Sequence, residues 1–349
     1  MADSYYQIAT TPKIFVSYPL YQYASGALDE YSSDNGSVSD EDMIKLLQIN
    51  PSNQVNIYDE SPYTQLNYKV VPSFDNETLV ATSGLWNFDF CMLLGHNFNT
   101  QSIIPSLGYG DINSSTSMAT SNIVNFNFGG VPEYDGWSLC SLDDTTSDDE
   151  RYFNLALTNP DAVVDCTIGS ILFGKSYEFP QNTTLATTTK FEYGIKQKST
   201  ISGKTISTAN WTKPNNWITE PFGLTNGEEG DNFQRRTGRR VWKMSFDSLA
   251  PDKVMAQNMM MNDNNYYPQD NHTQGSAENS SLYNINNSPD FFSAVVHRTM
   301  GGHLPMVLQL DKNDNSPSNF AIVRMNKNFT VTQKSPLLFN IKITLTEQI

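Results

Sequence analysis

The stretch of sequence that decides the fold runs from residue 291 to residue 311 and reads FFSAVVHRTMGGHLPMVLQLD. A polar loop at 312–318 follows it, and then come FAIVRM at 320–325 and FNIKITLTE at 339–347. The last segment alternates apolar and polar residues, which is the period of a half-buried strand. A Gly-Gly turn, a strand that ends in aspartate and two further strands therefore predict a C-terminal β-sheet.

The same strand-and-turn pattern extends back to about residue 85. Apolar or alternating segments predict strands at 85–98, 152–157, 163–174 and 240–246. In the last of these, Trp242, Met244 and Phe246 fall on one face of the strand. Residues 190–198 and 205–208 predict a β-hairpin around a turn at 201–204. The chain is therefore expected to be mainly β.

The first sixty residues are rich in tyrosine and acidic residues and contain few apolar ones. KIFVSY at 13–18 predicts a short strand that is stopped by Pro19. SDED at 39–42 precedes MIKLL and predicts a short helix, because acidic residues stabilise the positive end of a helix. A second short helix is predicted from residue 248 onward, with Ser248 as its cap and Pro251 in its first turn.

These patterns predict an N-terminal arm with a short helix at 1–60 and a β-sandwich region at 61–349. The second region divides further into a sandwich core at 61–247, a helix and long loop at 248–290, and the C-terminal strands at 291–349. An arm of this composition suits either contact with neighbouring subunits or a mobile tail.

The composition narrows the class of protein. Charged residues make up 17% of the 349 residues, below the quarter or so that is typical, and Asn, Ser and Thr supply much of the polar surface. The net charge of −15 argues against a non-specific nucleic-acid binder, which needs clustered Lys and Arg. We find no signal-peptide pattern and no apolar run long enough to span a membrane. Three scattered cysteines predict free thiols in a reducing cytoplasm.

Motifs that carry catalysis or bind metals are missing from the sequence. The patterns Gly-x-Ser-x-Gly and His-Glu-x-x-His and the phosphate loop do not occur. The segment 311–315 begins like a calcium loop, but Ser316 and Ile322 stand where glycine and a bidentate glutamate are needed, which favours a polar hairpin connection. The acidic residues at 143–150 are typical of a solvated loop rather than of a cation site or a glycosidase. We therefore expect no catalytic, cofactor-binding or metal-binding residues and no enzyme activity.

Three features in sequence order resemble structural proteins of tailed bacteriophages. They are an apolar strand followed by Gly-His-Asn at 95–97, the strand and bend at 163–174, and the C-terminal sheet. The proteins in question carry a discoidin-like or jelly-roll β domain, and the resemblance loosely covers residues 85–349. It implies a mainly β fold: a jelly-roll or discoidin-like β-sandwich with an N-terminal arm, a completing C-terminal β-sheet and one or two short helices. It also implies a non-enzymatic virion component, a tail or tail-attached adsorption protein that is assembled in the host cytoplasm.

Such a protein acts through subunit contacts, so its partners would be other virion proteins and copies of itself, with no nucleic acid and no membrane. The residues expected to anchor these contacts are aromatic or arginine residues. They are Phe15, Tyr18, Tyr21, Tyr23, Arg235, Arg236, Arg239 and Arg240. For the basic run at 235–240, a solvated turn whose arginines pair with nearby carboxylates is favoured over a contact with an acidic partner subunit.

Two alternatives remain open at this point. The first is a carbohydrate-binding module that recognises a host-surface glycan, with Trp211 and Trp217 stacking on the sugar. The second is a head-decoration or head-fibre protein, because the sequence does not distinguish the head of a virion from its tail. Core or subunit packing by the two tryptophans is favoured over the glycan interpretation.

Overall fold

The structure is a computed structural model. It describes residues 10–26, 28, 30–33, 37–50, 53–69, 89–110, 124–127, 129–133, 135–141, 152–160, 162–183, 187–208, 239–255, 289–315, 319–326 and 329–348. These residues are mainly in strands, and every pairing between the described strands is antiparallel. The mainly β prediction is therefore confirmed.

Strands outnumber helices among the described residues. The strands are β1 (Lys13–Phe15), β2 (Glu30–Ser33), β3 (Val55–Asp59), β4 (Tyr63–Lys69), β5 (Phe90–Leu94), β6 (Ile104–Gly110), β7 (Val124–Asn127), β8 (Trp137–Ser141), β9 (Tyr152–Thr158), β10 (Val164–Ile168), β11 (Ser170–Gly174), β12 (Ser176–Glu178), β13 (Thr188–Glu192), β14 (Lys196–Ser199), β15 (Thr205–Thr208), β16 (Arg239–Leu249), β17 (Met306–Gln309), β18 (Phe320–Met325), β19 (Thr330–Ser335) and β20 (Leu338–Glu347). The helices are α1 (Tyr18–Ser25), α2 (Asp40–Leu47), α4 (Phe98–Gln101), α6 (Pro251–Val254) and the π-helix η4 (Phe292–His297). No helix among the described residues is both long and apolar enough to cross a membrane.

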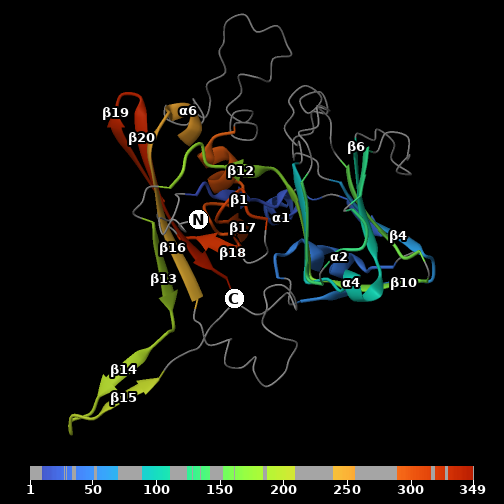
Figure 1. The fold of residues 1–349 in the computed structure, drawn as a ribbon, viewed down its shortest axis with the longest axis horizontal. Helices are drawn as coiled ribbons and strands as arrows, with labels where there is room; N and C mark the ends of the chain where they lie inside the picture. Colours follow the sequence, from blue (N-terminus) through green and yellow to red (C-terminus); the bar gives the residue numbers. More distant parts are fainter. Residues whose placement is uncertain are drawn as a thin grey trace, which may run out of the picture.

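Three of the sheets form the body of the molecule. The main sheet has the order β12-β1-β17-β18-β20-β16-β13, with β19 paired to β20. The middle sheet is β11-β5-β8, and the outer sheet is β2-β4-β9-β6-β7. Strands β10 and β3 form a separate pair, as do β14 and β15. Figure 1 shows the main sheet on the left of the molecule and the outer sheet on the right.

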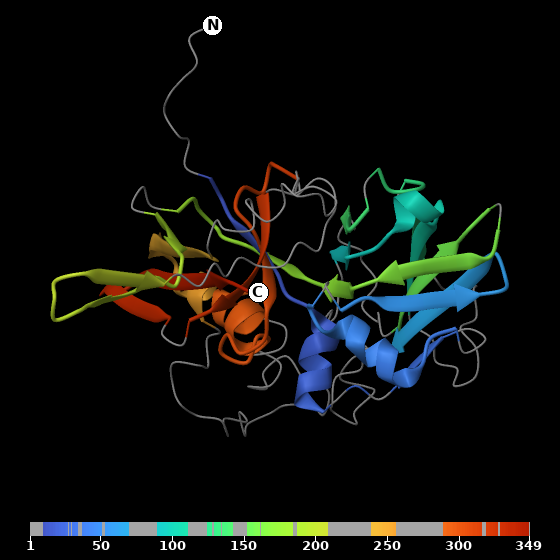
Figure 2. The ribbon, with the colours of Figure 1, turned by 90° about the horizontal axis from the view of Figure 1, so that it is seen from below.

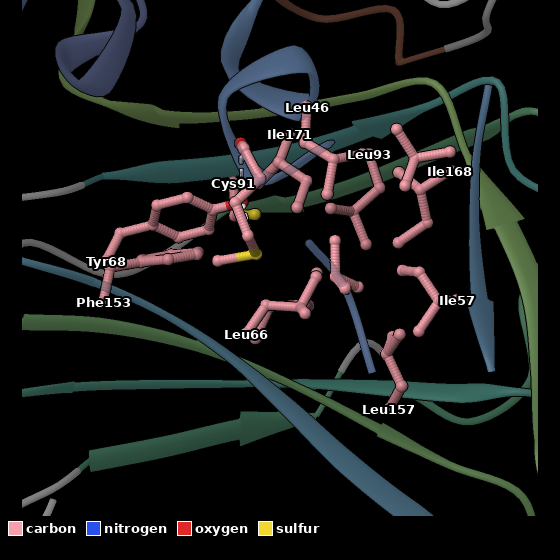
Figure 3. Close-up of a cluster of buried hydrophobic side chains, with 14 of the residues drawn as sticks. Leu46, Ile57, Leu66, Tyr68, Cys91, Leu93, Phe153, Leu157, Ile168 and Ile171 are labelled. Atoms are coloured by element: carbon pink, nitrogen blue, oxygen red, sulfur yellow. Dashed lines mark hydrogen bonds between the residues drawn. The ribbon is translucent and has the colours of Figure 1, made fainter. Parts of the chain in front are cut away.

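The middle sheet lies between the other two, and its strands β5 and β11 are buried on both faces, whereas β8 is partly exposed. Cys91 and Leu93 of β5 point into a first core, which they share with the outer sheet through residues such as Leu66 and Phe153 (Figure 3). The alternate residues of β5, with Met92 as an example, point into another core that they share with strands β1, β17 and β18 of the main sheet. A strand that is buried on both faces has a continuous apolar sequence. FCMLL of β5 and ILF of β11 meet this requirement.

The main sheet is covered on its far face by helix η4. Ile14 of β1 and Leu308 of β17 are paired in register, and both point into a third core, on this far face, with Phe291 and Val295. Trp242, Met244 and Phe246 of β16 lie in the same core. The face of β16 that was predicted from its alternating sequence is therefore confirmed.

The described part of the predicted N-terminal arm belongs to the body of the molecule, and the arm prediction was wrong there. Strand β1 pairs with β12 on one side and with β17 on the other. Pro19 does not merely stop a strand: it occupies the first turn of α1, where its missing N–H is not needed, and Ser17 caps that helix. Helix α2 is capped by Ser39 as predicted, and it buries Met43, Leu46 and Leu47 in the first core. Most of the described apolar residues of this segment are buried in the cores, although Tyr23 and Tyr58 are exposed.

Other predictions also need correction. The described chain contains five short helices rather than one or two, and 292–297 is a π-helix that leads into the Gly-Gly turn. Ser248 lies at the end of β16 with a φ of 61°, and Ala250 is the N-cap residue of α6. The main sheet also takes strands from all three predicted regions, the arm, the sandwich core and the C-terminal strands.

Candidate interaction surface

A β-hairpin of β14 and β15 projects from the body of the molecule. It extends beyond the other strands in two perpendicular views (Figures 1 and 2). Gly203 N donates to Thr200 O at 2.9 Å, and Thr200 N donates to Lys204 O at 2.8 Å. Gly203 has a φ of 78°, which suits the left-handed position of a three-residue hairpin loop. The hairpin that was predicted around 201–204 is therefore confirmed, but its first strand is 196–199, because residues 188–192 form β13 and pair with β16.

Every residue of β14 and β15 is exposed to solvent. An isolated two-stranded hairpin is only marginally stable in water, because it has no second layer on which to bury apolar surface. Three isoleucines of this segment are exposed nevertheless, and Ile201 at the tip of the turn is fully exposed. The other two are Ile195 and Ile206. Contact with a partner would bury this apolar surface.

The two faces of the hairpin differ in chemistry. Lys196 lies opposite Thr208, and Lys198 lies opposite Ile206. Directly opposed residues point to the same side of a sheet, so these four make one face that is cationic and partly apolar. The opposite face consists of Gln197, Ser199, Thr205 and Ser207, which are polar and uncharged. We refer to the first set as the lysine face.

The segment that carries the hairpin has the opposite sign of charge to the rest of the chain. Residues 187–208 contain four lysines and one glutamate, a net charge of +3. The remaining residues contain 18 cationic and 36 acidic side chains, a net charge of −18. Opposite potentials on two surfaces speed their encounter and fix their orientation. The hairpin is therefore complementary in charge to another copy of its own chain.

Two of the predicted aromatic anchors are core residues, and the prediction was wrong for them. Phe15 packs edge-on against Phe90 with ring centroids 4.8 Å apart. Tyr18 is fully buried, and its hydroxyl accepts a hydrogen bond from Arg298, whose guanidinium lies over the tyrosine ring. Burial raises the pKa of Tyr18 to about 12. Both side chains lie where the β1–α1 segment passes between the sheets, so neither can contact a partner.

The other two predicted tyrosines lie on α1. The hydroxyl of Tyr21 is 3.0 Å from Nε2 of His297 on η4, so this half-buried side chain ties the two helices together. Burial and the neighbouring Arg298 lower the pKa of His297. Tyr23 is exposed and accessible for contact. The structure thus places His297 against α1.

Of the four arginines predicted as anchors, Arg239 and Arg240 are among the described residues. Arg240 forms a bidentate ion pair with Glu347 on β20, and its Nε lies 3.0 Å from both carboxylate oxygens. Its guanidinium also lies over the ring of Trp242, at 4.9 Å from the centroid. Arg239 is half-buried beside it in β16. Arg240 therefore joins two strands of its own sheet, and Arg235 and Arg236 lie outside the described residues.

The tryptophans proposed to stack on a glycan, Trp211 and Trp217, also lie outside the described residues. Trp137 and Trp242 are buried.

Within the described ranges, no group of three or more His, Cys, Asp or Glu residues could hold a metal ion. Asp311 Oδ1 accepts a hydrogen bond from Asn313 N at 3.0 Å, which is the polar hairpin connection predicted at this place. The acidic run at 143–150 lies outside the described ranges.

The Gly-His-Asn turn at the end of β5 is hydrogen-bonded to the residue before β8 and to β10. Gly95 N donates to Gly136 O, and Asn97 Oδ1 accepts from Thr167 N at 2.8 Å. His96 is buried, and its Nε2 lies 2.9 Å from Ser138 Oγ. Its Nδ1 accepts from Phe98 N at 3.4 Å, so the proton of the neutral ring resides on Nε2 and points to the serine. A histidine in this state cannot take a proton from Ser138, which makes the pair structural rather than nucleophilic.

This buried histidine should make stability depend on pH. Burial lowers the pKa of His96 to about 4, below its usual value of about 6.5. Between these values the unfolded chain binds a proton that the folded chain does not, so stability is complete above about pH 6.5 and falls as the pH drops toward about 4. The loss amounts to up to roughly 3 kcal/mol. Urea unfolding across this range should show a shallower dependence for His96→Gln than for the unchanged chain, whereas the exposed His303→Gln should retain the full slope.

No protein-family model matches this chain, and no curated protein matches it.

Proposed function

We propose that this chain is a non-enzymatic structural subunit of a tailed-phage virion, in the tail or its attached adsorption apparatus. It acts by contact with copies of itself and with other virion proteins. The observation that carries this proposal is the projecting hairpin, whose exposed isoleucines and lysines have no role within the described body of its own chain. Three sheets stacked face to face, with strands β5 and β11 of the middle one buried on both sides, supply a rigid support for it.

The occupant of the lysine face is an acidic segment of a second copy of the chain, whose residues outside 187–208 carry a net charge of −18. Ile206 supplies apolar contact area at the centre of this face, and Lys196 and Lys198 supply the charge that selects an acidic surface. A few buried apolar anchors carry most of the affinity of an interface, and charged residues around them set encounter rate and orientation. Exposed charges are screened by salt, so the contact should weaken as ionic strength rises.

Self-association is the direct measurement. We expect light scattering on the purified full chain to show a concentration-dependent multimer, and K196Q/K198Q to weaken it by roughly tenfold or more. The matched control is Q197E/S207E, which changes the net charge by the same amount on the opposite face and should leave association nearly unchanged. A chain that is monomeric at every concentration, or two variants with equal effects, would contradict docking through the lysine face.

The virion assignment needs a separate experiment. Antibodies raised against the purified chain should label particles of the phage that encodes it, and electron microscopy of gold-labelled particles should place the label on the tail. Label on the head would support the head-decoration alternative in its place. Particles that carry no label and no peptide of this chain by mass spectrometry would refute a structural role in the virion.

A further inference from the structure

Two of the three cysteines lie directly opposite each other in the middle sheet. Cys91 of β5 and Cys140 of β8 are register partners in an antiparallel pair. Both side chains belong to the first core: Cys91 is fully buried in it, and Cys140 packs against it from the edge. The sequence separates the two residues by almost fifty positions, so their spacing alone gives no sign of this pairing.

The geometry of this pair suits a disulfide. Directly opposed residues of antiparallel strands have Cα atoms about 4.5 or 5.5 Å apart, and disulfides span Cα separations of about 4.4 to 6.8 Å. The two Cβ atoms must approach each other slightly to form the bond. Strand β8 is at the edge of the middle sheet as described, so it can move toward β5 without displacing a further strand of that sheet.

We propose that Cys91 and Cys140 form an oxidisable dithiol, and that a disulfide closes between β5 and β8 when the chain meets a disulfide oxidant such as oxidised glutathione. Cys140 is the residue that the oxidant reaches, because it is only half-buried. Cys91 is the resolving residue, because it is buried and lies across the strand pair from Cys140. Cys166 lies on β10 and pairs in register with Ile57, so it takes no part.

The reaction has two exchange steps. The Cys140 thiol loses its proton, and its sulfur attacks one sulfur of oxidised glutathione, which forms a mixed disulfide and releases one glutathione thiol. The Cys91 thiol then loses its proton, and its sulfur attacks Cys140 Sγ and expels the second glutathione thiol. In total two protein thiols are oxidised to one disulfide, and one glutathione disulfide is reduced to two thiols.

The surroundings of the two cysteines control the rate at which the disulfide forms. Burial raises the pKa of Cys140, and burial together with the nearby Cys140 raises the pKa of Cys91 well above its usual value. Only the thiolate attacks a disulfide, so the reaction is slow near neutral pH and accelerates as the pH rises. A reducing cytoplasm therefore leaves the pair as thiols, and the bond forms after exposure to an oxidising medium.

The test uses the purified full chain incubated with oxidised glutathione, then denatured and alkylated with N-ethylmaleimide. Intact mass should show three alkylated cysteines before oxidation and one afterwards, and peptide mapping should join Cys91 to Cys140. The bond closes a loop of almost fifty residues, so the oxidised chain should unfold at a Tm higher by roughly 5 °C. Reduction should return the Tm to its original value.

Matched variants separate the pair from the third cysteine. Cys166→Ala should keep the loss of two thiols and the rise in Tm, and Cys140→Ser should lose both. Cys91→Ala should stop the reaction at glutathione attached to Cys140, which would confirm the order of attack. Three alkylated cysteines in the oxidised chain, or a stable glutathione adduct on Cys140 when Cys91 is present, would overturn the proposal.

Discussion

Replacing Gly174 with alanine should destabilise the folded chain by roughly 4 kcal/mol or more, because there is no space for a β-carbon at this position. An added Cβ would lie 2.5 Å from Val16 O and 2.9 Å from Cδ1 of Tyr18. Both neighbours belong to the segment that joins β1 to α1, and this segment is held by the main sheet and the first core. The backbone carbonyl cannot yield as the end of a flexible side chain would.

Urea unfolding monitored by tryptophan fluorescence measures this loss. The matched control is Gly203→Ala in the hairpin turn, where φ is also positive but no atom lies within 4 Å of the added Cβ. That variant should cost only about 1 to 2 kcal/mol, the strain of a left-handed backbone. A Gly174→Ala chain as stable as the Gly203→Ala chain would show that β11 and the β1–α1 segment are not in close contact.

Truncation of Phe173 to alanine should lower the free energy of unfolding by roughly 3 to 5 kcal/mol. This side chain is fully buried in the first core and stacks on Phe153 with ring centroids 3.6 Å apart and planes inclined by 6°. Tyr68 approaches the same ring at 6.1 Å between centroids. Because residues from both the middle and the outer sheet surround it, the cavity cannot collapse without separating the two sheets.

Phe191→Ala in β13 is the control for this substitution. About half of the Phe191 side chain is exposed, so its removal leaves no cavity and should cost roughly 0.5 kcal/mol or less. Calorimetry or urea unfolding of both variants gives the comparison. Equal losses would mean that the middle and outer sheets do not share a packed core.

The sequence was sufficient to predict most strands, because the pattern of apolar and polar residues that marks a strand lies within the strand itself. The continuous apolar run of β5 and the alternation in β16 both report burial directly, and the faces of β16 came out as expected. The place of β1 could not be predicted in this way. Three residues carry little periodic signal, and the position of β1 between β12 and β17 depends on partners far along the chain.

The candidate surface was harder to predict than the fold. The sequence located the hairpin and its turn, but the isolation of β14 and β15 from every other sheet depends on the three-dimensional arrangement. Aromatic residues suit both interfaces and cores, and Phe15 and Tyr18 proved to be core residues. Arg240 was expected on the surface, but its carboxylate partner is 107 residues away in the chain. The Cys91–Cys140 pair likewise depends on strand register, which spacing does not show.

The position of β1 has a consequence for biosynthesis. This strand precedes both of its neighbours in the sheet along the chain, and one of them ends at Glu178 and the other at Gln309. A ribosome synthesises the chain from its amino end at about 5 to 20 residues per second. The apolar side chains of β1 therefore remain without the strand β17 for roughly 15 to 60 seconds. During that interval the nascent chain cannot complete the main sheet, so a molecular chaperone that shields Ile14 and Phe15 would have this time in which to act.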